Sequence, residues 1–153
     1  GDDWVTVGTA DGVRAIDGPL LAARGGVYRA GDGLAHAGLD DARDVAAAGP
    51  LAATAAGVYA LGNGWLDELA GDASVVATDG ERAHAVVDGT LHARTGDGWA
   101  AREVPVAAPP VDVAHGEATY AVTADGTVLV EAGDGWRSRS LGVPGVAALT
   151  VVA

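Results

Sequence analysis

A four-residue turn motif recurs along this chain and divides it into units of similar length. The motif reads Gly-Asp/Asn-Gly-Trp/Leu, and its four copies occupy residues 31–34, 62–65, 96–99 and 133–136. Successive copies end 31, 34 and 37 residues apart, and a second glycine opens an apolar run shortly before each copy. A period of about 20–50 residues is typical of architectures in which each repeat packs on the next. The repeat therefore predicts a chain of small stacked units.

Each unit is predicted to contain four short strands. In the last unit they are expected at about 111–114, 118–124, 127–132 and 136–141. Asp88-Gly89 and Asp125-Gly126 are each predicted to form a two-residue type I′ turn, because glycine tolerates the positive φ that this turn requires. Across the second turn we expect Val122 to face Leu129. No stretch has a sustained helical period, so the chain is predicted to be all-β.

Both faces of the hairpin around Asp125-Gly126 carry mainly apolar or small side chains. A sheet packed between two neighbouring sheets requires such faces, whereas a lone sheet would be polar on one side. The sequence therefore predicts a single β-propeller domain over 1–153, built of four-stranded antiparallel blades. The four complete blades are expected at about 10–39, 43–70, 73–106 and 111–143. A β-sandwich is the alternative fold.

The two ends of the chain predict partial blades. Residues 1–4 (Gly-Asp-Asp-Trp) are a further copy of the turn motif, so the chain is expected to open on the last strand of a blade. Residues 146–152 predict the first strand of another blade. We therefore expect a ring that is incomplete at its N-terminus.

The charge of the chain restricts its partners. There are nine arginines, no lysine and 21 acidic residues, which give a formal net charge of -12. Nucleic acids and anionic membranes are disfavoured, because they would meet a repulsive field. The self-repulsion is largely screened at about 1 M salt, where the Debye length is roughly 3 Å. Neither disulfides nor thiolate metal sites can form, because cysteine is absent.

Four segments carry a resemblance to a known family: 43–46 (Arg-Asp-Val-Ala), 62–65, 120–127 and 133–136. They resemble a β-propeller family of halophilic archaea to which no activity is assigned, and the likeness covers essentially the whole chain. It implies a fold and a halophilic host, and it implies no site residues. A looser likeness is to the Asp-box repeats of sialidase-type propellers. Their spacing is not met, because tryptophan directly follows glycine here, so sialidase chemistry is not implied.

No metal, cofactor or nucleotide site is predicted. The Gly31-x-Gly33 pattern and its copies precede no helix, and the acids never alternate as they do in a calcium loop. In the predicted hairpin His84 lies opposite Ala93 and His92 opposite Ala85, so these two imidazoles project from opposite faces and share no metal. All four histidines are interpreted as isolated surface or edge residues; they are His36, His84, His92 and His115.

Three further groups of residues are candidates for catalysis or ligand binding. The serines lie outside any nucleophile motif; they are Ser74, Ser138 and Ser140. Arg137 and Arg139 share one face of an outer strand and are interpreted as solvated edge charges, with a small anion or an acidic partner as the alternative. The repeated tryptophans are interpreted as packing one blade on the next, with a ligand-stacking ring as the alternative; they are Trp65, Trp99 and Trp136.

These observations favour a cytoplasmic, non-catalytic interaction module that binds another protein, as yet unknown, through its loops. No catalytic, cofactor-binding or metal-binding residue is assigned, and the oligomeric state is open. The second hypothesis is an enzyme or small-molecule binder with a site at the central channel. Titratable residues from different blades, gathered at the channel and with shifted pKa values, would support that second hypothesis.

Overall fold

The computed structural model describes residues 8–96, 98–132 and 135–140, and within these ranges the chain is entirely β-strand, turn and loop. Sixteen strands form four sheets. Blade 1 contains β1 (Val13–Asp17), β2 (Leu20–Ala23), β3 (Gly26–Ala30) and β4 (Leu34–Gly38). Blade 2 contains β5 (Ala42–Ala46), β6 (Leu51–Thr54), β7 (Gly57–Leu61) and β8 (Trp65–Ala70). Blade 3 contains β9 (Ala73–Thr78), β10 (Ala83–Val87), β11 (Thr90–Thr95) and β12 (Gly98–Ala101). Blade 4 contains β13 (Pro110–His115), β14 (Thr119–Thr123), β15 (Thr127–Ala132) and β16 (Gly135–Ser140).

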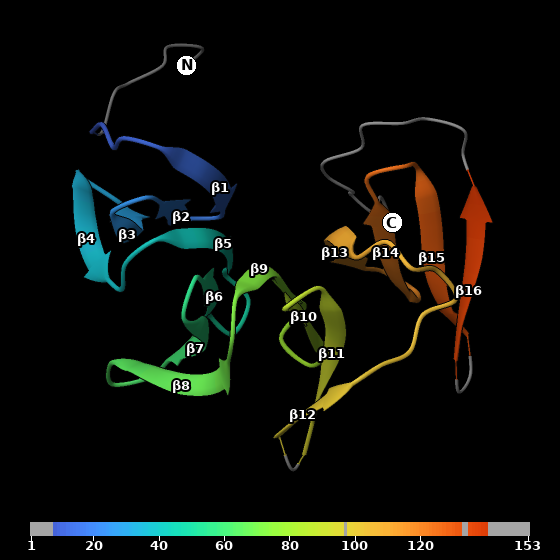
Figure 1. Ribbon diagram of the computed structural model, residues 1–153. Helices are drawn as coiled ribbons and strands as arrows, with labels where there is room; N and C mark the ends of the chain where they lie inside the picture. Colours follow the sequence, from blue (N-terminus) through green and yellow to red (C-terminus); the bar gives the residue numbers. More distant parts are fainter. Residues whose placement is uncertain (1–7, 97, 133–134, 141–153) are drawn as a thin grey trace.

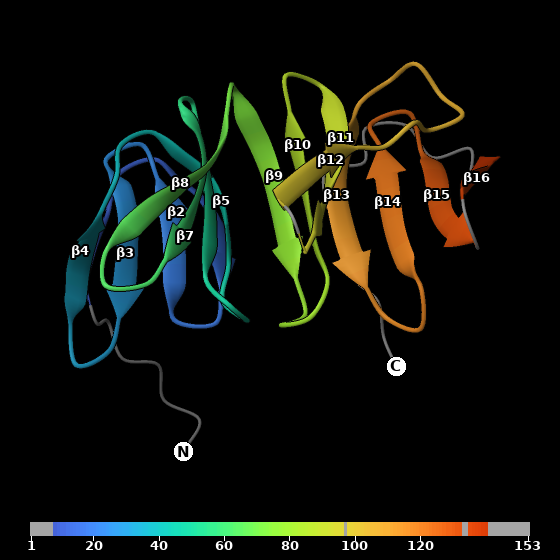
Figure 2. The ribbon, with the colours of Figure 1, turned by 90° about the horizontal axis from the view of Figure 1, so that it is seen from below.

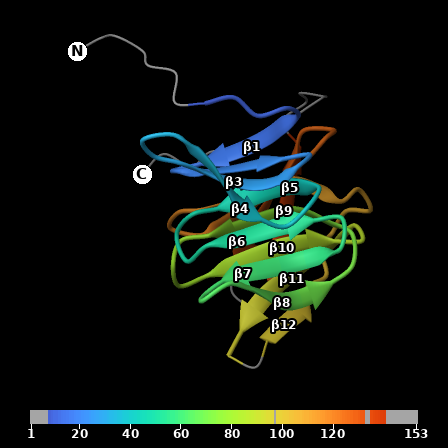
Figure 3. The same cartoon turned by 90° about the vertical axis from the view of Figure 1, so that its left-hand side faces the viewer.

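Each blade is an antiparallel meander in which strands pair in chain order. The blades follow one another in an arc, with the first strand of each blade on the inner side and the fourth on the outer side (Figure 1). Figures 2 and 3 show this arc from below and from the side on which β4 lies. The prediction of four complete four-stranded antiparallel blades is confirmed. The partial strands predicted at 1–4 and 146–152 fall outside the described residues.

Of the two predicted hairpin turns, one is confirmed and the other has a different register. Asp88 and Gly89 have φ values of 51° and 77°, and Val87 pairs with Thr90, as a two-residue type I′ turn requires. The prediction for Asp125-Gly126 is wrong by one residue, because Val122 pairs with Val128 rather than with Leu129.

A longer loop explains the shifted register of the second hairpin. The N–H of Gly126 donates to the carbonyl of Thr123, and Gly126 has a φ of 86°. This is the geometry of a three-residue loop, in which a type I turn is followed by a left-handed glycine. The hydroxyl of Thr123 donates to Asp125 and accepts the N–H of Thr127, which holds the wider loop.

The hydrophobic core consists of three clusters, one at each interface between consecutive blades. Their buried members are alanine, valine and leucine, and these small side chains let neighbouring sheets approach closely. In blades 2, 3 and 4 a tryptophan is the first or second residue of the fourth strand. It packs against the cluster shared with the preceding blade, as the sequence predicted; the three are Trp65, Trp99 and Trp136.

Candidate functional site

The four innermost strands line a groove of about 580 Å³ along the inner side of the arc. Its walls combine small apolar side chains with charged ones. The charged and ionisable lining residues are Arg14, Asp17, Arg43, Asp44, Asp79, Asp112 and His115. A volume of this size is typical of ligand-binding clefts. The groove is therefore the first candidate for a functional site.

A β-bulge recurs at the same place in every innermost strand. The extra residue is Arg14 in β1, Arg43 in β5, Ser74 in β9 and Val111 in β13. A bulge redirects the side chain that it carries. In blades 1 and 2 it presents an arginine at one end of the groove, whereas blades 3 and 4 carry a serine and a valine there.

The two bulge arginines form a chain of ion pairs that crosses from blade to blade. Arg14 Nη1 lies 2.5 Å from Asp41 Oδ1, and Arg43 Nη2 lies 3.7 Å from Asp41 Oδ2. Arg43 also binds Asp72, which directly precedes β9. The hydrogen bond from Arg14 lowers the pKa of the Asp41 carboxyl. Both groove arginines are thus engaged by carboxylates of the following blade.

Asp44 occupies the middle of the groove. Its carboxylate accepts the N–H of Val45 and, across the blade boundary, the N–H of Val76, each at 3.0 Å. Burial raises the pKa of Asp44 to about 7, and repulsion from Asp112 and Asp17 acts in the same direction. This carboxyl therefore changes its charge near neutral pH, which is unusual for an aspartate. Asp17 makes a comparable bond to the next blade, where it accepts the N–H of Ala47 at 2.8 Å.

The opposite end of the groove carries a polar group contributed by blades 3 and 4. Arg82 binds Asp79 through two nitrogens, at 2.9 and 2.7 Å, and also donates to the carbonyl of Gly116 at 2.8 Å. Hydrogen bonds from the backbone and side chain of Arg82 hold the pKa of Asp79 well below its usual range. The arginine thereby joins the turn after β9 to the turn after β13.

His84 and His115 meet beside this ion pair, with 2.9 Å between Nδ1 of His84 and Nε2 of His115. The interpretation of both as isolated surface or edge histidines is wrong, because His84 is only 4% exposed and the two rings contact each other. Burial lowers the pKa of His84 to about 4 and also lowers that of His115. Both imidazoles are therefore neutral at pH 7.

The pair could have been found by aligning the repeats. Asp17, Ala46 and Ala77 hold the same position in the first strands of blades 1, 2 and 3. Their partners in the second strands are Leu20, Leu51 and His84, so His84 occupies the place of a buried leucine. The prediction that His84 and His92 project from opposite faces is confirmed by the pairs His84–Ala93 and Ala85–His92.

The remaining candidates stay apart from one another. His36 bonds to the carbonyl of Gly25, and His92 bonds to the carbonyl of Thr90. Arg137 is exposed on β16, and the side chains of Arg139 and Ser140 fall outside the described part. Ser138 lies on β16 opposite Leu129, in a different sheet from the groove serine, Ser74, which lies on β9. Within residues 8–96, 98–132 and 135–140, no three His, Asp or Glu side chains are placed to hold a metal ion.

Comparisons with known proteins bear on the fold. A family model described as "Beta-prop_HVO_0234:-like, beta propeller" matches residues 1–152. A similar solved structure is PorZ, described as an essential bacterial surface component of the type-IX secretion system of Porphyromonas gingivalis, with 13% identity and a TM-score of 0.52. The match covers 78% of this chain and 20% of PorZ, so the chain spans about a fifth of the length of PorZ, and the likeness concerns the fold alone. No protein with a curated description matches the chain. No helix able to cross a membrane occurs among the described residues.

Proposed function

The chain belongs to the HVO_0234-like β-propeller family. We propose that it is a non-catalytic interaction module of the cell interior. Its central groove receives a segment of a partner protein that carries arginine or lysine beside apolar residues. The observation that carries this proposal is the composition of the groove, in which two arginines are ion-paired with carboxylates and three aspartates from different blades line the wall.

Charge complementarity supports a basic partner. Asp17, Asp44 and Asp112 come from three different blades and line one groove, and the whole chain carries a net charge of -12. Such a field attracts cationic segments and accelerates their association. An acidic partner would meet repulsion from these three carboxylates.

Exposed apolar residues support an accompanying apolar contact. Ile16, which lines the groove from β1, is 68% exposed, and Val13 on the same strand is 47% exposed. A large apolar side chain beside a ligand groove gains free energy when a partner covers it. A peptide with arginine and leucine or valine side by side fits both features.

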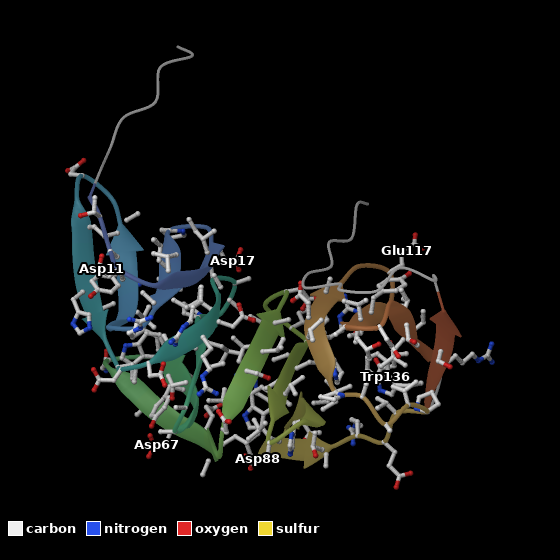
Figure 4. The ribbon with its side chains drawn as sticks, turned by 45° about the horizontal axis from the view of Figure 1, so that its top comes forward. Asp11, Asp17, Asp67, Asp88, Glu117 and Trp136 are labelled. Atoms are coloured by element: carbon white, nitrogen blue, oxygen red, sulfur yellow. The ribbon has the colours of Figure 1, made fainter. Side chains whose placement is uncertain are left out.

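The test is binding of two fluorescent seven-residue peptides, followed by anisotropy. One peptide carries two arginines among valine and leucine residues, and the other has glutamate in place of arginine. Asp17→Asn and Asp112→Asn are each expected to weaken the basic peptide about fivefold, equivalent to roughly 1 kcal/mol. Asp67→Asn removes an exposed carboxylate of β8, outside the groove, and is the matched control (Figure 4). Equal binding of both peptides would contradict the proposal.

The second candidate, an enzyme or small-molecule binder at the channel, is favoured by one observation. Asp44 has a pKa of about 7 inside a ligand-sized groove, and groups tuned in this way are common at active sites. Both carboxylate oxygens of Asp44 nevertheless hold backbone N–H groups, which is a structural task. Free arginine that binds as tightly as the basic peptide would favour this candidate over a protein partner.

A further inference from the structure

Three buried polar atoms of the described chain have no hydrogen-bond partner, and all three belong to the interface between blades 3 and 4. They are Nε2 of His84, Oγ1 of Thr119 and Nε1 of Trp136. His84 is 4% exposed and Thr119 is 0% exposed. A buried polar atom without a partner costs about 1–3 kcal/mol, so folded proteins rarely retain one without an ordered water or ligand.

Strand pairing brings these atoms to one end of the interface. Thr119 pairs with His115, and Trp136 pairs with Glu131. Because Tyr120 pairs with Val130, the same register sets Thr119 opposite Glu131. These residues therefore form one row on the face of blade 4 that looks toward blade 3. Across the interface, the ring of His84 lies 5.0 Å from the His115 ring and 6.0 Å from the Trp136 ring, measured between centroids.

At the second strand of the leading blade, this interface is more widely spaced than the other two. The second strand of blade 1 packs along β5, and the second strand of blade 2 packs along β9, whereas β10 makes little contact with β13. The eight-residue linker 102–109 enters here, and its Val104 and Val106 pack against the shared core. Away from the innermost strands, the sheets of blades 3 and 4 therefore lie farther apart than the sheets at the other two interfaces.

The indole of Trp136 shows what the wider interface lacks. Trp65 donates its indole N–H to the carbonyl of Ala37, and Trp99 donates its indole N–H to the side-chain Oε1 of Glu68. Each acceptor lies three residues after the last residue of the turn motif in the preceding blade. The equivalent residue for Trp136 is Arg102, beyond the end of β12 at Ala101. The side chain of Arg102 has no acceptor comparable to that of Glu68, and the indole N–H of Trp136 has no hydrogen-bond partner among the described residues.

We propose that blades 3 and 4 enclose a polar site that binds one neutral oxygen atom, supplied either by a water molecule or by the hydroxyl or carbonyl group of a small ligand. The oxygen accepts the indole N–H of Trp136 and bonds to His84 Nε2 and Thr119 Oγ1. This site is separate from the proposed partner contact in the groove. His115 connects the two, because its ring lines the groove and bonds to His84.

The charges around the site select a neutral occupant. Glu131 belongs to the row of residues on blade 4 that includes Thr119 and Trp136. Asp79 and Arg82 form a neutralised ion pair at the end of this row that is nearest the groove. Both histidines are neutral at pH 7, because burial lowers the pKa of each, and Arg82 and Arg102 act in the same direction on His84. An anion would find no protonated imidazole here, and a lone buried charge is costly.

The test is nuclear magnetic resonance of the indole groups of the full chain labelled with ¹⁵N-tryptophan, with Trp136 assigned through Trp136→Phe. We expect magnetisation transfer from a long-lived water to the Trp136 indole proton and none to the Trp65 indole, which already has a protein acceptor. Thr119→Val, which keeps the shape of the side chain, is expected to shift the Trp136 signal and to leave that of Trp65 in place. Absence of the water signal at Trp136 in the wild type would overturn the proposal.

Three probes distinguish the sources of the oxygen. Ethylene glycol or acetamide that displaces the water and shifts the Trp136 signal identifies a site for a small neutral ligand, whereas no displacement identifies a site for water. Displacement by acetate would overturn the proposal, because it requires an anion site. His84→Leu restores the leucine of blades 1 and 2 and should abolish both the water signal and the response to probes. His92→Leu, on the opposite face of blade 3, should change neither.

Discussion

Asp44 ties two blades together with a carboxyl group that titrates near neutral pH. Its bond to the N–H of Val76 is one of the few direct links between the innermost strands of blades 2 and 3. The position recurs as Asp112 in blade 4, whereas blade 3 has Val75 there. A residue that joins blades in this way links the protonation state of the groove to the stability of the arc.

The first prediction concerns the pH dependence of stability that Asp44 causes. Its pKa is about 7 in the folded state and near 3.8 when unfolded, so the folded state binds the extra proton between these values. The contribution of Asp44 to the unfolding free energy is therefore lost as the pH rises toward and through 7. Urea unfolding at pH 6.5, 7 and 8 should show wild-type stability falling with pH and a shallower fall for Asp44→Asn. Asp67→Asn controls for the change in net charge, and equal slopes for wild type and Asp44→Asn would contradict the assignment.

The second prediction concerns acid sensitivity at His84. The pKa of its imidazole is lowered from 6.5 to about 4 by burial, so the unfolded chain binds the proton first on acidification. Stability contributed by the neutral ring is present above pH 6.5 and is lost as the pH falls from 6.5 toward 4. His84→Leu should lose less unfolding free energy over this range than the wild type does. The comparison with His92→Gln tests whether any histidine has the same effect; an equal benefit from both variants would argue against His84.

The individual contacts could be predicted from the sequence only in part. The opposite orientation of His84 and His92 follows from one hairpin, and that inference is correct. The contact of His84 with His115 joins two different blades, so it depends on how far the sheets are apart and how they are aligned. Only the exchange of a repeated leucine for histidine signalled that the interface was different.

At the scale of the strands, local turn chemistry decides the register. Asp88-Gly89 forms the predicted two-residue turn, but Thr123 stabilises a longer loop at Asp125-Gly126 through its hydroxyl. The strand bounds of the last blade were predicted to within about two residues of the observed ones. The register of the second hairpin could not be predicted, because the dipeptide Asp125-Gly126 does not reveal that the Thr123 side chain bonds back across the loop.

The third prediction concerns the glycine that opens β3. Gly26 has a φ of 124°, and an added Cβ would lie 2.3 Å from the carbonyl oxygen of Leu39. Gly26→Ala is therefore expected to destabilise the fold by at least roughly 1–3 kcal/mol, the usual range for backbone strain alone. Gly31→Ala, where an added Cβ meets nothing within 4 Å, should change stability little. Thermal unfolding of both variants measures the difference, and similar midpoints would refute the close approach of the strands.

At the scale of the whole molecule, net charge opposes compactness. The chain carries -12, and the ion pairs of Arg14, Arg43 and Arg82 neutralise only part of the acidic surface. Exposed pairs of this kind contribute about 0–1 kcal/mol each. The blades are therefore held mainly by the three apolar clusters, against a repulsion that depends on salt.

The fourth prediction is that salt stabilises the arc. Raising NaCl from 0.1 to about 1 M shortens the screening length from about 10 Å to roughly 3 Å, so repulsion among carboxylates falls. The midpoint of thermal unfolding should rise over this range, and choline chloride at equal ionic strength should have a similar effect. A midpoint that falls or stays constant would show that repulsion does not limit stability.

In the described part of the chain, backbone pairing between strands is confined within each blade, and the blades join through side chains, linkers and aspartate-to-backbone contacts. Gene duplication or deletion of one repeat therefore adds or removes a whole sheet without leaving any strand unpaired. Ring size in such a lineage is free to change by single recombination events. New side-chain contacts can then arise in one blade, such as the histidine pair of blades 3 and 4, while the other copies preserve the fold.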